Sequence, residues 1–185
     1  MIKLRHATII EKKKTYEWLC LSDTASLHMG EPDYPESSIP TWIEFQDDFE
    51  DFYYLERGRK KGSVMIIESD EEEIGCLCYA CFHLKPNTAE LDIWLKEKKF
   101  CGKGFGPQAL QLLVKYLIER RDVKNFIIRP SEKNIRAIAA YEKVGFVRTN
   151  NKENTIKEYI IDKYIGEYGA GDYGYENTAI LIMEK

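Results

Sequence analysis

The sequence predicts a single α/β domain. Its 185 residues, 44% of them apolar, are enough for one well-packed core and few for two. Over residues 91–95, Leu, Ile and Leu alternate with Asp and Trp, which is the period of a strand with one apolar face. From Leu110 to Leu117 apolar residues recur at intervals of three and four, as in an amphipathic helix. A glycine-rich turn joins these two elements.

The beginning of the chain predicts a strand and a helix. Ile2 to Ala7 is apolar and short enough for a first strand. Thr8 and Glu11 have the spacing of a capping box, which predicts a helix through Leu21. From Ser22 to Pro40, one glycine and three prolines interrupt a stretch with little apolar periodicity, so we expect a long loop.

A second helix and a strand pair are predicted next. Thr41 can cap the helix, whose aromatic stripe is typical of core packing. This stripe consists of Trp42, Phe45, Phe49 and Phe52. Ser63 to Glu68 and Ile74 to His83 then predict two antiparallel strands joined by a polar turn. Three of the five cysteines lie in the second strand, where we expect buried free thiols and no metal site.

After the amphipathic helix, which should end near Arg120, the pattern predicts strand, helix and strand. Lys124 to Arg129 is a short strand that Pro130 stops. Ser131 can cap the following helix, which should end at Gly145. Val147 to Asn150 then begins a further strand.

A Tyr- and acid-rich insertion, residues 151–176, delays the last strand, Ala179 to Met183. Its tyrosines and acids alternate along the chain. They are Tyr159, Tyr164, Tyr168, Tyr173 and Tyr175, with Glu158, Asp162, Glu167, Asp172 and Glu176. The insertion is either a surface excursion or a wall of the acceptor site.

Net charge and hydropathy limit the partners. A formal charge of -4 and a pI near 5.6 argue against a nucleic-acid binder and favour a cationic partner. No stretch reaches the roughly 20 apolar residues of a membrane span, and the start lacks the apolar core of a signal peptide. We therefore expect a cytoplasmic protein with no membrane partner, either a monomer or a homodimer.

The glycine-rich turn is a candidate anion site. Gly102, Gly104 and Gly106 leave backbone N–H groups accessible, and the helix that follows adds unpaired donors and a partial positive charge. These properties suit a phosphate or a diphosphate. The spacing is neither that of a nucleotide-hydrolase phosphate loop nor that of a dinucleotide fold.

This turn resembles the signature of the GNAT superfamily of acyl-CoA-dependent N-acyltransferases, Arg/Gln-x-x-Gly-x-Gly/Ala between a strand and a helix. Gly104 and Gly106 match its glycines, whereas Cys101 stands where the family has Arg or Gln. A second stretch, Asn134 to Phe146, resembles the family's Asn-x-x-Ala-x-x-x-Tyr-Glu-Lys-x-Gly-Phe helix. The resemblance is strongest from about Gly62 to Phe146.

The resemblance implies one GNAT-like domain over residues 1–185, with a mixed, mostly antiparallel twisted sheet, flanked by helices and splayed at the acyl-CoA site. The implied cofactor is acetyl-CoA (coenzyme A), with no metal. A backbone N–H near Trp94 or Leu95 would polarise the thioester. The residues expected to hold the cofactor are Ile93, Trp94, Leu95, Gly102, Lys103, Gly104, Phe105, Gly106, Asn134, Ala137 and Tyr141.

Three residues are candidates for the chemistry. Glu90 and Asp92 lie two apart on the strand, so both carboxylates face one side and could attract an alkylammonium and accept its proton. The chain is similar to bacterial aminoglycoside 6'-N-acetyltransferases from Asp92 through Phe146, which favours Asp92 as the base. The resemblance assigns Tyr141 the role of acid toward the departing thiolate.

The sequence therefore predicts an acetyl-CoA-dependent N-acetyltransferase acting on a small cationic amine, such as an aminoglycoside or polyamine, by direct transfer in a ternary complex. Two alternatives remain open at this stage. One is a protein or peptide N-acetyltransferase, and the other is an acyl-CoA-binding module without turnover.

Overall fold

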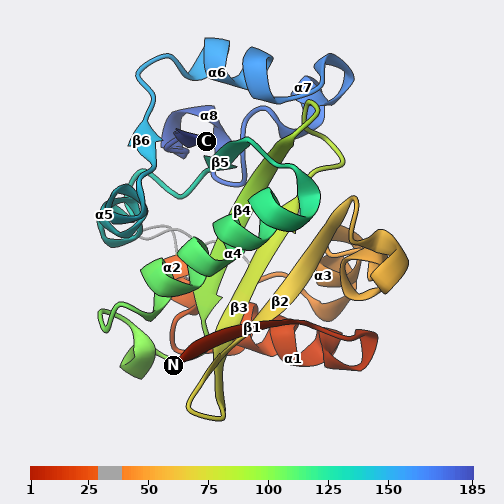
Figure 1. The fold of residues 1–185 in the computed structure, drawn as a ribbon, viewed down its shortest axis with the longest axis vertical. Coiled ribbons are helices and arrows are strands. Elements are labelled where there is room, and N and C mark those ends of the chain that lie inside the picture. Colours follow the sequence, from red (N-terminus) through yellow and green to blue (C-terminus); the bar gives the residue numbers. More distant parts are fainter. Residues whose placement is uncertain (29–38) are drawn as a thin grey trace.

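The computed structural model describes residues 1–28 and 39–185. Within them, seven strands form one sheet in the order β1-β2-β3-β4-β5-β7-β6, and only β4 and β5 pair in parallel (Figure 1). The strands are β1 (Ile2–His6), β2 (Gly62–Ser69), β3 (Glu72–Ala80), β4 (Thr88–Leu95), β5 (Asn125–Ile128), β6 (Val147–Arg148) and β7 (Leu181–Glu184). The predicted mixed, mostly antiparallel sheet is confirmed.

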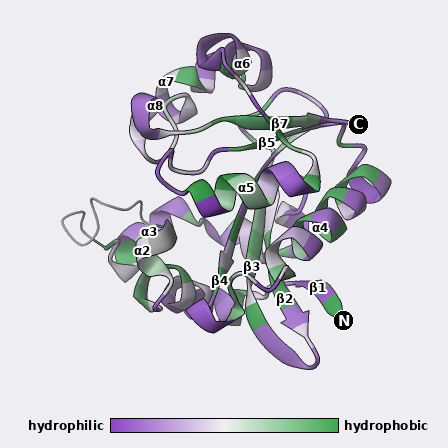
Figure 2. Cartoon of the chain, turned by 90° about the vertical axis from the view of Figure 1, so that its left-hand side faces the viewer, coloured by the Kyte–Doolittle hydropathy of each residue, from purple (hydrophilic) through white to green (hydrophobic). Residues whose placement is uncertain are grey.

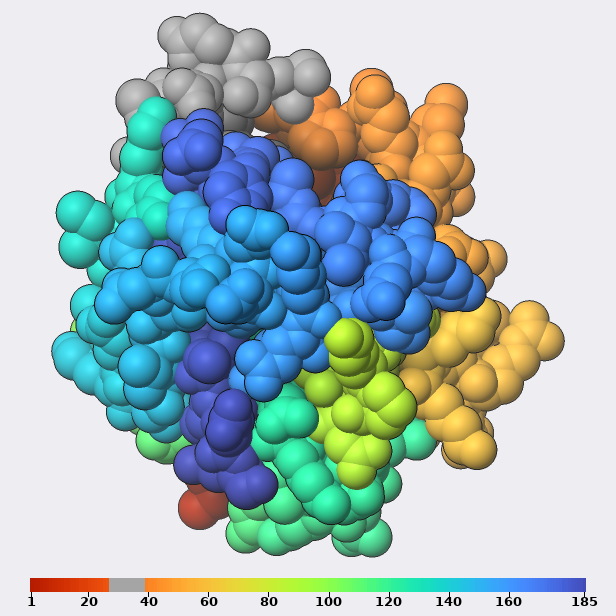
Figure 3. Space-filling view, turned by 90° about the horizontal axis from the view of Figure 1, so that it is seen from above, coloured from red at the N-terminus to blue at the C-terminus, as the bar shows by residue number. Residues whose placement is uncertain are grey.

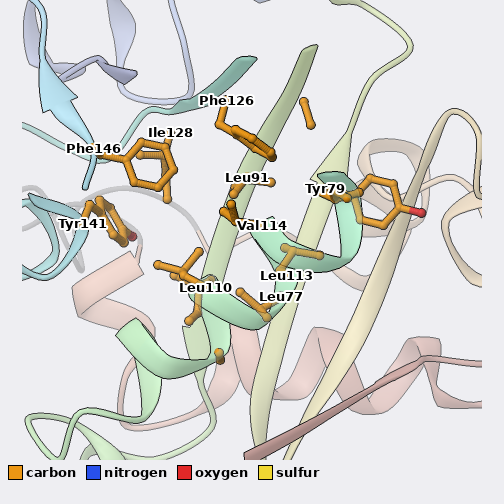
Figure 4. Close-up of a cluster of buried hydrophobic side chains, with 14 of the residues drawn as sticks. Leu77, Tyr79, Leu91, Leu110, Leu113, Val114, Phe126, Ile128, Tyr141 and Phe146 are labelled. Carbon is orange, nitrogen blue, oxygen red and sulfur yellow. The ribbon is translucent and has the colours of Figure 1, made fainter. Parts of the chain in front are cut away.

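Helices cover both faces of this sheet. They are α1 (Lys12–Tyr16), α2 (Ala25–His28), α3 (Trp42–Asp48), α4 (Phe105–Arg121), α5 (Ile135–Val144), α6 (Lys152–Tyr159), α7 (Ile165–Tyr168) and α8 (Gly174–Asn177). On one face, α4 and α5 pack against apolar side chains of the central strands, among them Leu77 and Leu91 (Figure 4). On the other face, Phe49 and Tyr53 join Cys76 and Trp94.

The apolar stripe of α4 holds the glycine turn in place. Leu110, Leu113 and Leu117 are each fully buried, and each contributes about 1.5–3 kcal/mol relative to an exposed position. The helix begins at Phe105, earlier than Pro107, so Gly106 and Pro107 belong to its first turn. Packing of α4 therefore sets the direction in which the first amides of the helix point.

The N-terminal helix is interrupted, unlike the prediction. The capping box is present, since the Thr8 amide donates to Glu11 Oε2 at 2.9 Å. However, a 3-10 turn precedes α1, and a π-helical stretch, Glu17–Leu21, follows it. The predicted loop from Ser22 to Pro40 contains α2, and its residues 29–38 lie outside the described residues.

The predicted start of α3 is correct, but α3 and β3 both end earlier than predicted. Thr41 caps α3 as predicted, with its hydroxyl accepting from the Glu44 amide, but α3 ends at Asp48, so Phe52 lies in a separate 3-10 turn. The predicted strand ending at His83 is too long, because β3 ends at Ala80. In the described chain, the cysteines are free, and Cys76 and Cys78 are buried as predicted, whereas Cys81 lies beyond β3 and is half-buried.

The cap assigned to Ser131 is wrong. Asn134 is the N-cap of α5, and its side-chain oxygen accepts from the Ala137 amide at 3.1 Å. Ser131 is instead buried and forms an isolated antiparallel bridge with Thr178. Gly145 ends the helix in the left-handed region, with φ of 111°, as predicted.

The insertion is mostly helical and packed. Ile156, Tyr159 and Ile160 are buried in a small apolar cluster with Leu84 and Ile180. The outer side of α6 is hydrophilic, which Figure 2 shows as purple. Figure 3 shows the segment spread over one end of the molecule, beside the turn that follows β3, where the Lys85 amide donates to the Tyr159 carbonyl.

The described residues hold neither a membrane-spanning helix nor a cluster of metal ligands. No helix among them has the length and apolar character required to cross a membrane. Nor do residues 1–28 and 39–185 contain a group of three His, Cys, Asp or Glu side chains that could hold a metal ion.

Candidate active site

The turn before α4 presents its amides outward. Gly102 and Gly104 adopt φ of 74° and 82°, in the left-handed region that glycine occupies without strain. Gly104 is the N-cap of α4, and both glycines are exposed. The amides of residues 102–106 donate to no backbone carbonyl in the described parts of the chain. These donors and the positive end of a 17-residue helix fit a diphosphate.

The side chains of this turn contribute few polar groups that could contact a bound phosphate. Lys103 is exposed and can supply a positive charge near a bound phosphate. Phe105 is half-buried and lies 6.4 Å from Phe100, measured between ring centroids. The thiol of Cys101 lies 3.9 Å from the Glu97 carbonyl oxygen. Position 101 therefore offers no cationic or amide side chain, and the donors of this turn are main-chain amides.

β4 separates from β5 halfway along its length. The last pair between them is Leu91 with Ile128, whereas β4 continues to Leu95 beside β3. This separation was predicted as the splay at the acyl-CoA site. It leaves the edge of β4 from Asp92 onward without a strand partner on the β5 side.

The antiparallel ladder with β3 determines which amides face this gap. The Lys96 amide donates to the Ile74 carbonyl at 3.0 Å, and hydrogen-bonded pairs alternate with non-bonded pairs along the ladder. Trp94 therefore directs its amide toward β3, while Ile93 and Leu95 direct theirs into the gap. The Leu95 carbonyl accepts from the Thr24 hydroxyl at 2.6 Å. Of the two predicted oxyanion donors, the alternation favours Leu95.

Asp92 lies on β4 at the start of the gap. Its side chain is partly exposed to solvent. The protein around the carboxyl nevertheless removes much of its hydration, and this desolvation raises its pKa to about 7. The negative charges of Asp172 and Glu90 raise the pKa further, while a hydrogen bond from the Ile93 amide at 2.7 Å opposes the shift. A carboxyl with this pKa can exchange a proton at neutral pH.

Glu90 is in a different state, although it shares the face of Asp92. Arg129 donates to both of its oxygens, at 2.5 and 2.9 Å, and His83 Nε2 lies 2.7 Å from Oε2. Burial raises the pKa of Glu90, but the charge and hydrogen bonds of Arg129 and the His83 bond outweigh it and lower the pKa to about 2. Glu90 is therefore ionised and held in place, which favours Asp92 as the base.

Tyr141 lies on α5 at the margin of the main core, beside Leu110 and Phe146 (Figure 4). Burial and the charge of Asp92 raise its pKa well above the usual range, so the phenol keeps its proton. Asn134, two turns earlier on the same helix, uses its side-chain oxygen for the cap, and Ala137 is half-buried between them. A protonated phenol near Asp92 can donate a proton or a hydrogen bond.

The insertion brings residues to the site that sequence analysis did not single out. The charge of Asp172 acts on Asp92, and the Tyr173 phenol lies close enough to Asp92, Asp172 and Tyr141 for burial and these groups to raise its pKa well above the usual range. Burial and the charge of Glu90 raise the pKa of Asp172. The alternation of tyrosines and acids marked this segment, but nothing in it distinguished position 172 from its neighbours.

The turn that carries Asp172 and Tyr173 is tightly held. The Thr178 hydroxyl lies 3.1 Å from the Ala170 carbonyl oxygen and 2.8 Å from that of Gly174. Gly171 has φ of 69°, and a Cβ there would come within 2.8 Å of the Thr178 side chain. The Thr178 side chain therefore ties the two ends of this turn together and leaves no room for a Cβ at position 171.

Replacing Gly104 by Ala should weaken coenzyme A binding about tenfold. The left-handed φ of Gly104 would cost alanine about 1–2 kcal/mol. Without bound coenzyme A, the turn can relieve this strain by changing φ, which directs its amides away from the diphosphate site. Isothermal titration calorimetry with coenzyme A measures the change. Gly166→Ala is the control, since a Cβ there meets nothing and φ is ordinary. Equal affinities for both variants and the wild type would contradict the assignment of this turn.

Comparisons with known proteins agree with this geometry. Residues 2–147 match the acetyltransferase (GNAT) domain family. The fold is similar to aminoglycoside acetyltransferase AAC(6')-Ib in complex with coenzyme A and kanamycin, with a TM-score of 0.68, 20% identity, and coverage of 100% of this chain and 95% of that one. It is also similar to spermidine N-acetyltransferase from Vibrio cholerae in complex with CoA and spermine, with a TM-score of 0.67, 15% identity, and coverage of 99% and 95%.

Two further similar proteins are a protein acetyltransferase and a kanamycin resistance protein. RimL, a ribosomal alpha-N-protein acetyltransferase in complex with coenzyme A, has a TM-score of 0.68, 20% identity, and coverage of 99% of this chain and 93% of that one. A kanamycin resistance protein of Rhizobium radiobacter is 36% identical over 63 residues, which are 34% of this chain and 58% of the relative. The chain thus spans little more than half the length of this relative.

The family match covers most of the chain, and the glycine turn and the separated strands are where the family's motifs predict them. Similar folds have been solved with CoA or acetyl-CoA bound, in agreement with the predicted cofactor. The chain belongs to the GNAT family of acetyltransferases.

Proposed function

We propose that the protein transfers an acetyl group from acetyl-CoA to a primary amine of a small polycationic acceptor, an aminoglycoside or a polyamine, directly in a ternary complex. The observation that carries this proposal is that Asp172 of the insertion faces Asp92 where β4 leaves β5. These acids come from β4 and the insertion, and together they favour a ligand with more than one ammonium group.

The chain has a place for each part of the cofactor. The amides of residues 102–106 would hold the diphosphate, and the free edge of β4 at Ile93 and Leu95 would pair with the pantetheine arm. When bound, acetyl-CoA supplies the acetyl group as an activated thioester. The Leu95 amide would donate to the thioester carbonyl oxygen and polarise it.

Asp92 prepares the acceptor. An alkylammonium is protonated at neutral pH and has no lone pair for attack, so a proton must leave before transfer. A carboxyl with a pKa of about 7 is ionised often enough to accept this proton and basic enough to hold it. Glu90, with a pKa of about 2 and both oxygens bonded to Arg129, is a poor proton acceptor.

Replacing Tyr141 by Phe should lower kcat about 10²-fold and leave coenzyme A affinity nearly unchanged. The variant removes the hydroxyl that would protonate the departing thiolate but keeps the buried ring, which lies 6.4 Å from Phe146 between centroids. Thiol release measures kcat, and calorimetry measures affinity. Tyr159→Phe is the matched control, because Tyr159 is equally buried but belongs to the insertion's own cluster. Equal kcat values for both variants would remove Tyr141 from the mechanism.

A peptide N-terminus is the second candidate acceptor. The fold is as similar to RimL as to the aminoglycoside enzyme, with TM-scores of 0.68 for both. A thiol-release screen of aminoglycosides and polyamines against peptides separates the two. Preferred turnover of the cationic small molecules supports the proposal, and preferred turnover of peptides overturns it. Stabilisation by coenzyme A without thiol release on any amine would indicate a binding module.

A further inference from the structure

Arg129 joins three elements at the point where the sheet opens. It follows Ile128, the last residue of β5 to pair with β4. Its side chain is 6% exposed. The guanidinium donates to both Glu90 oxygens on β4, and Nη1 donates to the Tyr168 carbonyl of α7 at 2.5 Å. One buried side chain therefore links β5, β4 and the insertion.

His83 holds the same two partners from another direction. Its Nε2 lies 2.7 Å from Glu90 Oε2, and its ring stacks on that of Tyr168, with centroids 4.7 Å apart and planes 26° apart. The His83 side chain is 3% exposed. Glu90 and Tyr168 are thus fixed relative to each other by two independent sets of contacts.

We propose that Arg129 is a positioning residue for acetyl transfer, which fixes where β4 and β5 separate and holds the insertion against the acceptor side of β4. This inference rests on the proposed function, since it concerns the side where the amine would bind. The guanidinium has a rigid planar fork, and its bidentate bond to Glu90 aligns β4 immediately before Asp92.

The link to Tyr168 explains how the insertion reaches the site. Tyr168 ends α7 and is followed by the tight turn that carries Asp172 and Tyr173. Arg129 anchors the start of this turn, and Thr178 anchors the rest. If the Arg129 bond were lost, the segment that carries Asp172 and Tyr173 would lose its hydrogen bond to the end of β5.

The charges around Asp92 give the proposal a specific signature. Asp92 faces Asp172 and Tyr173 from the insertion, Tyr141 from α5, Glu90 from its own strand and Cys78 from β3. The positive charge of Arg129 offsets the two acids among them, since it interacts with both Glu90 and Asp172.

Further titratable groups face Asp172 and Glu90. Asp172 also faces Asp48 and His83, and Glu90 also faces Tyr53. Removing the charge of Arg129 would leave Asp92 more strongly repelled by Glu90 and Asp172, and its proton would leave at higher pH. A lysine at this position would keep the charge and lose the fork.

The test compares Arg129→Lys and Arg129→Gln with a control, Ile67→Ala, which opens a cavity in the core at β2. In Arg129→Lys we expect kcat/KM for the amine to fall at least tenfold, KM for acetyl-CoA to change less than twofold, and the pH profile to stay in place. In Arg129→Gln we expect the same loss of kcat/KM, and in addition the increase of kcat/KM with pH should occur at higher pH than in the wild type. A role in stability alone predicts that both variants match Ile67→Ala in all three quantities, and this result would overturn the proposal.

Hydrogen exchange tests the positioning without substrate. In Arg129→Lys, the amides of residues 165–176 should exchange at least tenfold faster than in Ile67→Ala. The amides of β2 and β3 should not exchange faster in Arg129→Lys than in Ile67→Ala. Unchanged exchange in residues 165–176 would overturn the proposal. If the wild type acetylated no amine, the proposed function would fail, and the exchange result would still decide whether Arg129 holds the insertion.

Discussion

Replacing Asp92 by Asn is expected to lower kcat/KM for the amine by about 10²–10⁴-fold, the usual contribution of a general base. Asparagine keeps the size of the side chain and can still contact the Ile93 amide, which the carboxylate accepts from at 2.7 Å. Coenzyme A affinity should therefore be retained, which calorimetry can verify. A loss of less than threefold in a thiol-release assay would exclude Asp92 as the base.

The pH profile provides an independent check of the same role. The Asp92 pKa is raised to about 7, so the ionised, active form accumulates as pH rises through 7, and kcat/KM should rise with it. This rise should be absent in Asp92→Asn. In Asp172→Asn it should move to lower pH, because one of the charges that raise the Asp92 pKa is removed. A profile that is unaffected by either change would contradict the role of Asp92.

Replacing Arg129 by Ala should reduce the free energy of unfolding by about 3–5 kcal/mol, the cost of leaving a buried charge without its partner. Glu90 would keep His83 but lose both bonds from the guanidinium, and the Tyr168 carbonyl would lose its donor. Urea unfolding at neutral pH measures the difference. Lys157→Ala is the control, since its ion pair with Glu153 is exposed on both sides and should be nearly neutral.

The Arg129–Glu90 pair also predicts how stability depends on pH. The pKa of Glu90 is lowered to about 2 in the folded protein, so the ionised form stabilises the fold above the ordinary glutamate pKa. This contribution should be lost as pH falls from about 4.5 toward 2. In Arg129→Ala the corresponding loss should be smaller. An identical acid dependence in both proteins would show that the pair does not control the Glu90 pKa.

Local patterns predicted the elements that are proposed to hold the cofactor. Strand β4, the glycine turn and α4 follow from alternation, glycine spacing and helical periodicity, each of which depends on residues close in sequence. The family that these motifs indicated is confirmed by the match over residues 2–147, whereas the cofactor contacts assigned to Gly104 and its neighbours stay predictions. The catalytic roles of Asp92, Glu90 and Tyr141 stay predictions.

Contacts between distant segments could not be predicted in this way. Arg129 was expected only as the end of a strand, and its bonds to Glu90 and Tyr168 join residues 39 positions apart on either side. Ser131 looked like a helix cap, but its bridge to Thr178 draws it into the interior, and Asn134 caps α5 in its place. Periodicity carries no information about such pairings.

The position of β7 between β5 and β6 determines when the acceptor side can form. β5 and β6 do not pair with each other, so the segment from Lys152 to Asn177 must close as a loop before β7 can enter between them. Such long-range closure is entropically costly and slow. During folding, the side that is proposed to select the amine is therefore complete only after the last strand has paired with both β5 and β6.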